Sequence, residues 1–296
     1  MSRIVVVGDI VTDVLAVYSG EIAHGSDTAA RIHLTAGGSA ANTAAWLARA
    51  GRPVTLVGVV GGDAPGAQRL AELAESGVDC AVRVAPGAVT GSVVVLSQAE
   101  ERTMLCDRGA NALLSTVDVD GAVASARDAV HLHLSGYVLF DGDSRAAGRD
   151  ALATAARQGL TTSVDAASAG PLRRVGGAAF LDWVRAADLL LANLDEARAL
   201  LSLDAPPEVL AAGLAGHVPH AVVKLGAEGA VWAGHDGTLV RVPAQPAAVA
   251  DPTGAGDAFA AGLLDSWLSG TGPGGALQAG AALGARAVSV PGARPC

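Results

Sequence analysis

Short, continuous runs of apolar residues alternate with stretches of helical periodicity along most of the chain. The first two runs, 4–8 and 54–60, have the pattern of strands that are buried on both faces of a sheet. Residues 41–50 and 67–76 have helical spacing, and a glycine that can end a helix follows each of them. This alternation predicts an α/β fold whose central sheet is mostly parallel and carries helices on both faces. Further strands are predicted at 130–134, 161–164, 189–192 and 221–225, with helices at 118–127, 144–158, 194–201 and 208–216.

Two stretches, 14–34 and 90–107, interrupt this alternation. The first alternates loosely and carries polar residues, and the second predicts a hairpin around a polar turn at 98–101. Because both stretches leave the α/β core and return to it, we interpret them as two insertions that form one small β-rich lid. The alternative is a pair of ordinary surface excursions. Since the sequence has no internal repeat and no low-complexity linker, residues 1–296 are predicted to form a single domain.

The composition and charge of the 296 residues narrow the class of protein. Hydrophobic residues make up 51% of the chain but aromatic residues only 3%, so the core must consist mainly of Ala, Val and Leu. The net charge of −9 argues against a nucleic acid or an anionic membrane as the partner. Lys224 is the one lysine among the 20 basic residues, which draws attention to it.

The sequence carries no signal for secretion or membrane insertion. The segment MSRIVVVGDI becomes polar too early for a signal peptide, and no apolar run approaches the roughly 18 residues of a membrane span. The three cysteines, Cys80, Cys106 and Cys296, show no C-x-x-C spacing, and their odd count indicates a reducing compartment. We therefore expect a cytoplasmic protein.

The segment DPTGAGDAF, residues 251–259, places three small residues directly before an acid and an apolar stretch of helical spacing. If a helix begins here, the backbone N–H groups of Gly254, Ala255 and Gly256 form an anion site at its positive end. Asp257 then lies in the first turn, where the same dipole favours its carboxylate. The other explanation is purely structural, because Asp is a good N-cap and glycine-rich turns precede many helices.

The full string resembles the second signature of the ribokinase-like, or phosphofructokinase-B type, sugar and nucleoside kinases. The resemblance implies that the backbone of Gly254, Ala255 and Gly256 stabilises the charge on the transferred phosphoryl group. It also implies that Asp257 is the base that takes the proton from the acceptor hydroxyl. The chemistry is consistent, since phosphoryl transfer depends mainly on positioning and electrostatic stabilisation.

The string TAGGSAANTAAWLARAG, residues 35–51, resembles the first signature of the same family. Taken by itself, it reads as a junction between a loop and a helix. In the family context, Gly37 and Gly38 permit a close backbone approach, and the Asn42 amide suits a pair of acceptor hydroxyl groups. Because the two signatures lie in order near opposite ends of the chain, the resemblance covers essentially its whole length.

Three more residues are expected near the acceptor. Asp13, just beyond the first strand, matches the acid that binds a sugar hydroxyl in the family, although it also suits a turn. Arg108 and Asn111, in DRGAN, follow the hairpin and either face the acceptor or belong to a charged loop. Ribose is a doubtful substrate, because three positions depart from the polar and charged contacts of ribokinase itself: Val11, Ser39 and Ser135.

A second group of residues is expected to hold the nucleotide and its metal ion. Asn193 and Glu196 have the spacing of a helix capping box, which explains them without any function. The family has an N-x-x-E motif at the equivalent place, which implies that Glu196 organises Mg²⁺ through water near the phosphates of ATP. Lys224 and Gly226 match the loop that lies against those phosphates, and a solvated strand-end lysine is the alternative. Asp165, at the end of a strand, is a lesser candidate.

The resemblance also implies an adenine pocket, a monovalent cation site and an assembly. Adenine is expected between residues 242–249 and the helix predicted at 276–289. Asp251 and Thr253, with the C-terminal segment, match positions where many family members bind K⁺ through backbone carbonyls. A homodimer is expected because the lid edges of this fold often pair between subunits.

These inferences give one main hypothesis and two alternatives. We predict an enzyme that uses ATP and Mg²⁺ to phosphorylate a hydroxymethyl group on a small sugar or sugar derivative. A nucleoside kinase of the same fold is the first alternative, with Trp46, Tyr18 and Tyr137 as aromatic residues on the acceptor side. A non-catalytic regulator that binds nucleotide or sugar is the second, although it would not need Asp257. An NAD-dependent dehydrogenase is excluded, since G-x-G-x-x-G does not follow the first strand.

Overall fold

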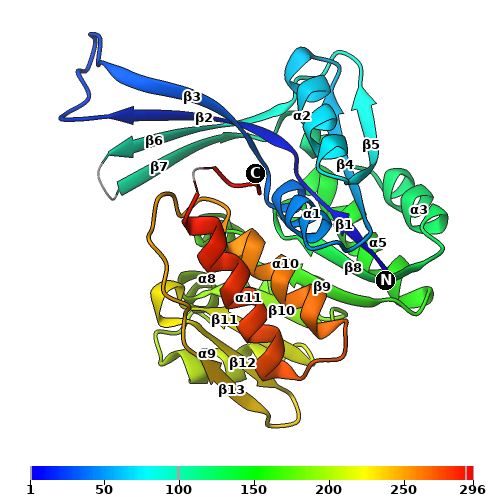
Figure 1. Cartoon of the computed structure of the whole chain (residues 1–296). Helices are drawn as coiled ribbons and strands as arrows, with labels where there is room; N and C mark the ends of the chain where they lie inside the picture. Colours follow the sequence, from blue (N-terminus) through cyan, green and yellow to red (C-terminus); the bar gives the residue numbers. More distant parts are fainter. Residues whose placement is uncertain (1, 99–100, 291, 296) are drawn as a thin grey trace.

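The computed structural model describes residues 2–98, 101–290 and 292–295. Within that part of the chain the strands form two sheets, one of nine strands and one of four (Figure 1). The large sheet has the order β13-β12-β11-β10-β9-β8-β1-β4-β5. Its strands from β11 to β5 run parallel, whereas β12 and β13 add antiparallel pairings at one edge. This architecture confirms the predicted α/β fold with a mostly parallel sheet.

The strands of the large sheet are buried on both faces at its centre. Along β1, Val5 and Val7 belong to the apolar core on one face, and Ile4 and Val6 to the core on the other. The continuous apolar runs of the sequence are therefore the consequence of two covered faces. The strands are β1 (Arg3–Val7), β4 (Val54–Gly61), β5 (Asp79–Ala85), β8 (Ala129–Ser135), β9 (Thr161–Asp165), β10 (Leu189–Asn193), β11 (His220–Lys224), β12 (Ala230–Gly234) and β13 (Leu239–Val242).

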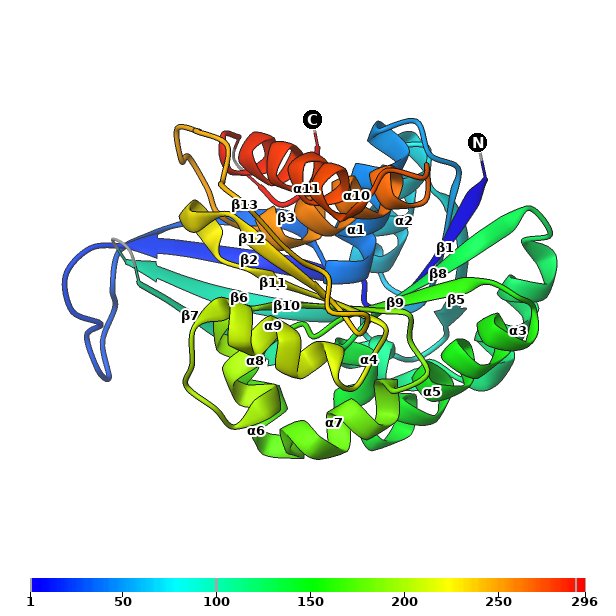
Figure 2. The same ribbon diagram turned by 90° about the horizontal axis from the view of Figure 1, so that it is seen from below.

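Helices cover both faces of this sheet (Figure 2). One layer holds α1 (Ser39–Arg49), α2 (Ala64–Glu75), α10 (Ala255–Trp267) and α11 (Pro273–Val288). The other layer holds α3 (Thr116–Ser125), α4 (Tyr137–Phe140), α5 (Gly142–Arg157), α6 (Ala169–Val175), α7 (Gly177–Val184), α8 (Leu194–Leu201) and α9 (Pro207–Ala215). Two short 3-10 helices are η1 (Gly109–Leu113) and η2 (Gly226–Glu228). The sequence pattern did not predict α6 and α7, because Gly176 divides this region into pieces of two turns, too short to show a period.

The four-stranded sheet extends away from the α/β body (Figure 1). It has the order β3-β2-β6-β7 and consists of β2 (Val11–Tyr18), β3 (Ala30–Gly37), β6 (Gly91–Gln98) and β7 (Glu101–Asp107). The two insertions meet where β2 and β6 pair in parallel, so they form one sheet as expected. The middle of the turn predicted at 98–101 lies outside the described residues.

Helices α1 and α10 are held side by side by a buried arginine. Arg52, which follows α1, is 5% exposed, and its Nη2 lies 2.6 Å from Oδ1 of Asp265 in α10. The same guanidinium donates to the Asp265 carbonyl and to Ser269 Oγ, both at 2.8 Å. A buried cation is stable only with such a set of acceptors. This contact joins the C-terminal ends of the two helices, at the end opposite to their first turns.

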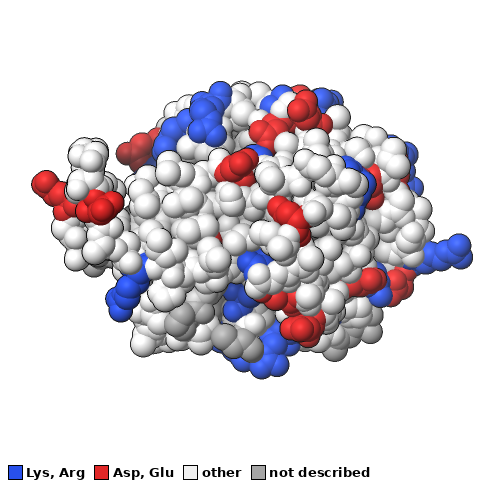
Figure 3. Space-filling model, turned by 90° about the horizontal axis from the view of Figure 1, so that it is seen from above, with Lys and Arg blue, Asp and Glu red and all other residues white. Residues whose placement is uncertain are grey.

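The surface carries both signs of charge. On the face shown in Figure 3, acidic and basic side chains are interspersed rather than separated into large patches. Within the described residues, no helix has both the length and the apolar character required to cross a membrane.

Candidate active site

The first turns of α1 and α10 face each other, and Asp257 lies between them. Its Oδ1 accepts a hydrogen bond from Ser39 Oγ at 2.8 Å, and its Oδ2 accepts one from Asn42 Nδ2 at 2.9 Å. Helix α10 begins at Ala255, after Gly254 in the left-handed region, and no side chain caps its N-terminus. The Ala255 N–H donates to the Pro252 carbonyl over a long 3.3 Å.

The environment of Asp257 makes its carboxyl group an unusually good proton acceptor. Burial raises its pKa to about 7, and the nearby Asp165 carboxylate acts in the same direction. The hydrogen bonds from Asn42 and Ser39 favour the charged form and limit the rise. A base whose pKa lies near neutral pH is well matched to proton transfer from an alcohol.

A cavity of about 510 Å³ lies between Asp257 and the four-stranded sheet. The sheet contributes an apolar wall of Val93, Val95, Met104 and Cys106. The opposite side is polar and brings together residues that are distant in the sequence. It includes most residues expected to bind the acceptor, namely Asp13, Gly38, Asn42 and Arg108.

The two glycines of the first signature make room for acids of this chain. A Cβ on Gly37 would lie 2.4 Å from Asp13 Oδ2, so only glycine lets that carboxylate pack against the end of β3. Gly38 has φ 99°, and a Cβ there would lie 2.4 Å from the Asp9 carbonyl. Burial, together with the Asp9 charge, raises the pKa of Asp13 to about 6. The two glycines therefore allow a close approach to the backbone, but the groups that approach are Asp13 and Asp9 of the protein itself.

Asp9 is a site residue that the sequence analysis missed. It is 4% exposed, its Oδ2 accepts from the Ser39 N–H at 2.9 Å, and its Oδ1 accepts from Ser135 Oγ at 2.9 Å. It thus holds the beginning of α1, next to the residues that contact Asp257. The sequence did offer a signal for Asp9, because it directly follows the first strand and a glycine. The nearby Asp13 was instead assigned as the acid that binds a sugar hydroxyl.

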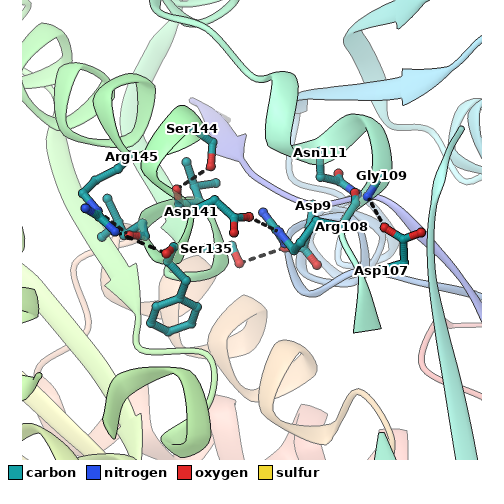
Figure 4. Close-up of polar contacts among 12 residues, drawn as sticks. Asp9, Asp107, Arg108, Gly109, Asn111, Ser135, Asp141, Ser144 and Arg145 are labelled. Carbon is teal, nitrogen blue, oxygen red and sulfur yellow. Dashed lines mark hydrogen bonds and ion pairs between the residues drawn. The ribbon is translucent and has the colours of Figure 1, made fainter. Parts of the chain in front are cut away.

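Two polar side chains of the DRGAN segment, Arg108 and Asn111, have different tasks (Figure 4). Arg108 lines the cavity, pairs with Asp141 at 2.8 Å and lies 5.8 Å from the centre of the Tyr137 ring. Asn111 does not face the acceptor. It is 3% exposed and forms hydrogen bonds to both the N–H and the carbonyl of Ile10, so it fixes the turn between β1 and β2.

A second cavity of about 550 Å³ lies on the other side of the α10 N-terminus. It is bounded by the segment from Ala244 to Val249 and by α11 residues such as Ala281, Gly284 and Val288, where adenine is expected. The two cavities share lining residues, because Lys224, Gly226 and Gly256 border both of them. The amides at the start of α10 thus lie at the junction of two pockets.

Lys224 is not the solvated strand-end lysine of the alternative explanation. Its side chain is 13% exposed, and its Nζ lies 2.6 Å from Oδ2 of the buried Asp165. Burial opposes the charge, but the Asp165 and Glu196 carboxylates outweigh it and raise the lysine pKa above its ordinary value. A Cβ on Gly256 would lie 3.4 Å from this ammonium group. Lys224 therefore places positive charge beside the α10 amides.

Asn193 and Glu196 form the capping box that their spacing predicts. Glu196 Oε2 accepts from the Asn193 N–H at 2.7 Å, and Asn193 Oδ1 accepts from the Glu196 N–H at 2.9 Å. Both side chains also border the acceptor cavity beside Lys224. Burial, although opposed by Lys224, raises the pKa of Glu196 to about 7. Its oxygen donors fit a hydrated Mg²⁺, which binds carboxylates directly or through water.

The C-terminal segment closes against the loop before α10. Asp251 Oδ1 accepts from the Thr253 N–H and hydroxyl, and its Oδ2 accepts from the Gly292 N–H at 3.1 Å. The carbonyl of Ala293 accepts from Trp46 Nε1 at 3.0 Å. Asp251 and Thr253 therefore lie at the expected meeting point of this loop and the chain end.

Comparison with known proteins identifies the class of enzyme. The model of the pfkB family of carbohydrate kinases matches residues 1–296, and the chain belongs to this family. It is therefore an ATP-dependent carbohydrate kinase, as the two signatures predicted. A 2-dehydro-3-deoxygluconokinase from Thermoproteus tenax is 34% identical over 262 residues, which are 86% of this chain and 80% of the relative. An ATP-dependent ribose-1-phosphate kinase from Halopiger xanaduensis is 33% identical over 79% of this chain and 73% of its own length.

Solved structures share the fold over nearly the whole chain. An adenosine kinase from Sinorhizobium meliloti superposes with a TM-score of 0.88 at 25% identity, covering 99% of this chain and 96% of that one. A protein from E. coli, named as a candidate ribokinase II and solved with ATP and Mg²⁺, gives 0.85 at 25% identity, with coverages of 99% and 94%. These likenesses confirm the ribokinase-like fold.

The two glycines of the α10 loop should differ in what they contribute to stability. At Gly254, φ is 75° and a Cβ would lie 2.5 Å from the Ala293 carbonyl oxygen. At Gly256, among the described residues outside its own helix, a Cβ would meet only Lys224 Nζ, at 3.4 Å. We expect Gly254→Ala to lower the free energy of unfolding by about 1–3 kcal/mol. Gly256→Ala should stay within about 1 kcal/mol of the wild type. Urea denaturation measures both, and equal losses would contradict the geometry.

Proposed function

We propose that this protein transfers the γ-phosphoryl group of ATP to a hydroxymethyl group of a small sugar or sugar derivative. Asp257 takes the proton of the attacking hydroxyl, and the backbone amides of residues 254–256 stabilise the phosphoryl group. The observation that carries this proposal is the position of Gly256, which borders both cavities, next to Asp257. An acceptor in one cavity and a nucleotide in the other would meet at this point.

The other residues have supporting roles in this proposal. Asp13, Gly37, Gly38, Asn42 and Arg108 bind or shape the acceptor side. Lys224 and Gly226, which border both cavities, and Asn193, which borders the acceptor cavity beside them, lie against the phosphates, and Glu196 would hold Mg²⁺ through water. When bound, Mg²⁺ neutralises charge on the phosphates. Asp251 and Thr253 form a K⁺ site with the C-terminal segment.

The reaction takes place in the cytoplasm. There the two free cysteines of the described residues, Cys80 and Cys106, would stay reduced.

The acceptor cavity favours a sugar derivative over a nucleoside. Of the three aromatic residues expected on the acceptor side, Tyr137 is among the described lining residues. Trp46 is 1% exposed and bonded to the C-terminal segment, so it offers no face to a base. Arg108 supplies a cation that suits a sugar acid or a sugar phosphate. The nucleoside kinase remains the alternative within the same fold, and a regulator without turnover is the alternative from another class.

Replacing the proposed base should abolish turnover without affecting binding. We expect Asp257→Asn to lower kcat by about 10²–10⁴-fold, because the amide cannot accept the proton. ATP consumption would be measured over neutral sugars, sugar acids, sugar phosphates and nucleosides, in KCl and in NaCl. Undiminished turnover in the variant would refute the base. Turnover of nucleosides alone would favour the first alternative, and calorimetric binding without any turnover would favour the regulator.

The rate should depend on pH through Asp257. Its pKa is raised to about 7, and only the deprotonated form accepts a proton, so activity should be lost as the pH falls below about 7. At saturating ATP and Mg²⁺, kcat/KM for the acceptor should decrease tenfold per pH unit on the acid side. Asn42→Ala removes a hydrogen bond that lowers this pKa, so its acid limb should move to higher pH. Coinciding profiles for both proteins would contradict the assignment.

The outer face of the four-stranded sheet supports the proposed homodimer. The strand register places Ile32, Leu34 and Leu105 on one face, and they are 64%, 70% and 58% exposed. The opposite face carries Asp13 and Val93, which line the acceptor cavity. An apolar face of this kind is stable when a second copy of the sheet covers it.

Light scattering should therefore give twice the chain mass of 29.1 kDa. Leu34→Asp should reduce the measured mass to that of one chain, since it buries a charge in the proposed interface. Val117→Asp, at a residue of α3 that is 78% exposed, is the matched control and should remain dimeric. A wild-type protein of one-chain mass at micromolar concentration would rule out the dimer.

A further inference from the structure

The C-terminal segment brings an arginine into the site that neither signature contains. The two residues before Arg294 are held in place, since the Gly292 N–H donates to Asp251 and the Ala293 carbonyl accepts from Trp46. Its side chain is 10% exposed. Nε donates to Asn42 Oδ1 at 3.2 Å. A guanidinium buried to this extent and aimed at a site residue calls for a functional explanation.

Two further contacts fix the position of the Arg294 fork. Nη2 donates to the Gly37 carbonyl at 2.9 Å, at the end of the strand that leads from the four-stranded sheet into α1. Nη1 lies 3.9 Å from Oε2 of Glu72 in α2, a carboxylate that also pairs with Arg69. The planar guanidinium can make these contacts together only in one orientation. The fork is therefore rigid where it meets Asn42.

The contact between Arg294 and Asn42 decides which way the Asn42 amide faces. Arginine has only donors, so it must meet the carbonyl oxygen of the amide. The amide nitrogen is then directed at Asp257 Oδ2, at 2.9 Å. If the amide were reversed, donors would face Arg294 and an acceptor would face the carboxylate. Both contacts would then be repulsive, so one cation enforces one orientation.

We propose that Arg294 is a positioning residue for phosphoryl transfer, which aligns the Asp257 carboxylate by fixing the Asn42 amide. This inference rests on the proposed role of Asp257 as the base. Among the described residues, those that line the acceptor cavity include Asn42 and Asp257 but not Arg294. Arg294 thus acts on the reaction through Asn42, without touching the acceptor.

A double-mutant cycle tests this coupling. Arg294→Met keeps the length of the side chain but removes its donors, and it should lower kcat by about tenfold with little change in KM for ATP or acceptor. In the Asn42→Ala background the same change should lower kcat by less than about twofold, because the amide it orients is gone. Arg294→Lys, which keeps the charge but not the fork, should give an intermediate kcat. Arg185→Met is the control at a side chain that is 76% exposed, and it should match the wild type.

The outcomes separate this inference from the proposed function. Suppose that Asp257→Asn abolishes turnover, but that the kcat losses of Arg294→Met and Asn42→Ala multiply in the double variant. The positioning role of Arg294 is then wrong, whereas the assignment of Asp257 as the base stands. A rise in KM for the acceptor with unchanged kcat also overturns it, since Arg294 would then bind the acceptor. If Asp257→Asn retains turnover, both fail. Thermal melting of every variant identifies loss of fold, and if Arg294→Met unfolds, a wild-type kcat for Arg294→Lys overturns the inference.

Discussion

The pair of hydrogen bonds from α1 to Asp257 is the interaction on which the rest of the site depends. A carboxylate removed from water is costly unless donors satisfy it, and Ser39 and Asn42 supply them from another helix. The first turns of α1 and α10 must therefore lie close together. Small residues such as Ala44 and Ala261 form the core between the layers, and Arg52 secures the far end of α10. A chain poor in aromatic residues is well suited to this close packing.

Glycines also allow close packing at the edges of the site. Gly37 yields space to the Asp13 carboxylate, and Gly254 yields space to Ala293 of the C-terminal segment. Both positions were expected to admit a ligand, yet each also admits another part of the protein. Because these two positions carry no Cβ, the four-stranded sheet, helix α10 and the C-terminal segment can all approach the site closely. The small residues of both signatures therefore have a packing role in addition to any role in binding.

Most of the fold followed from local patterns, whereas parts of the site did not. Apolar runs such as that of β1 and helical periods such as that of α10 are local, so the sequence predicts them. The strings around Asn42 and Asp257 predicted which residues gather in the site, but not that these two would bond to each other. The roles of Asp9, Asp165 and Arg294 were missed or undervalued, because their partners lie far away in the sequence. A single sequence carries no signal for such contacts, and Arg294 belongs to no recognisable motif.

The departures from ribokinase gain a physical meaning in the structure. Ser39 and Ser135 direct their hydroxyl groups at Asp257 and Asp9, so both are used to hold acids of the protein. Val11 adds to the apolar lining of the acceptor cavity. In the proposed function, recognition of the acceptor falls mainly to Asp13 and Arg108, a carboxylate and a cation beside an apolar wall. An acceptor that combines a hydroxyl pair with an anionic group would suit both side chains, whereas a neutral pentose would leave Arg108 in its ion pair with Asp141. If the proposed function is right, the chain keeps the residues for phosphoryl transfer and differs from ribokinase at positions expected near the acceptor.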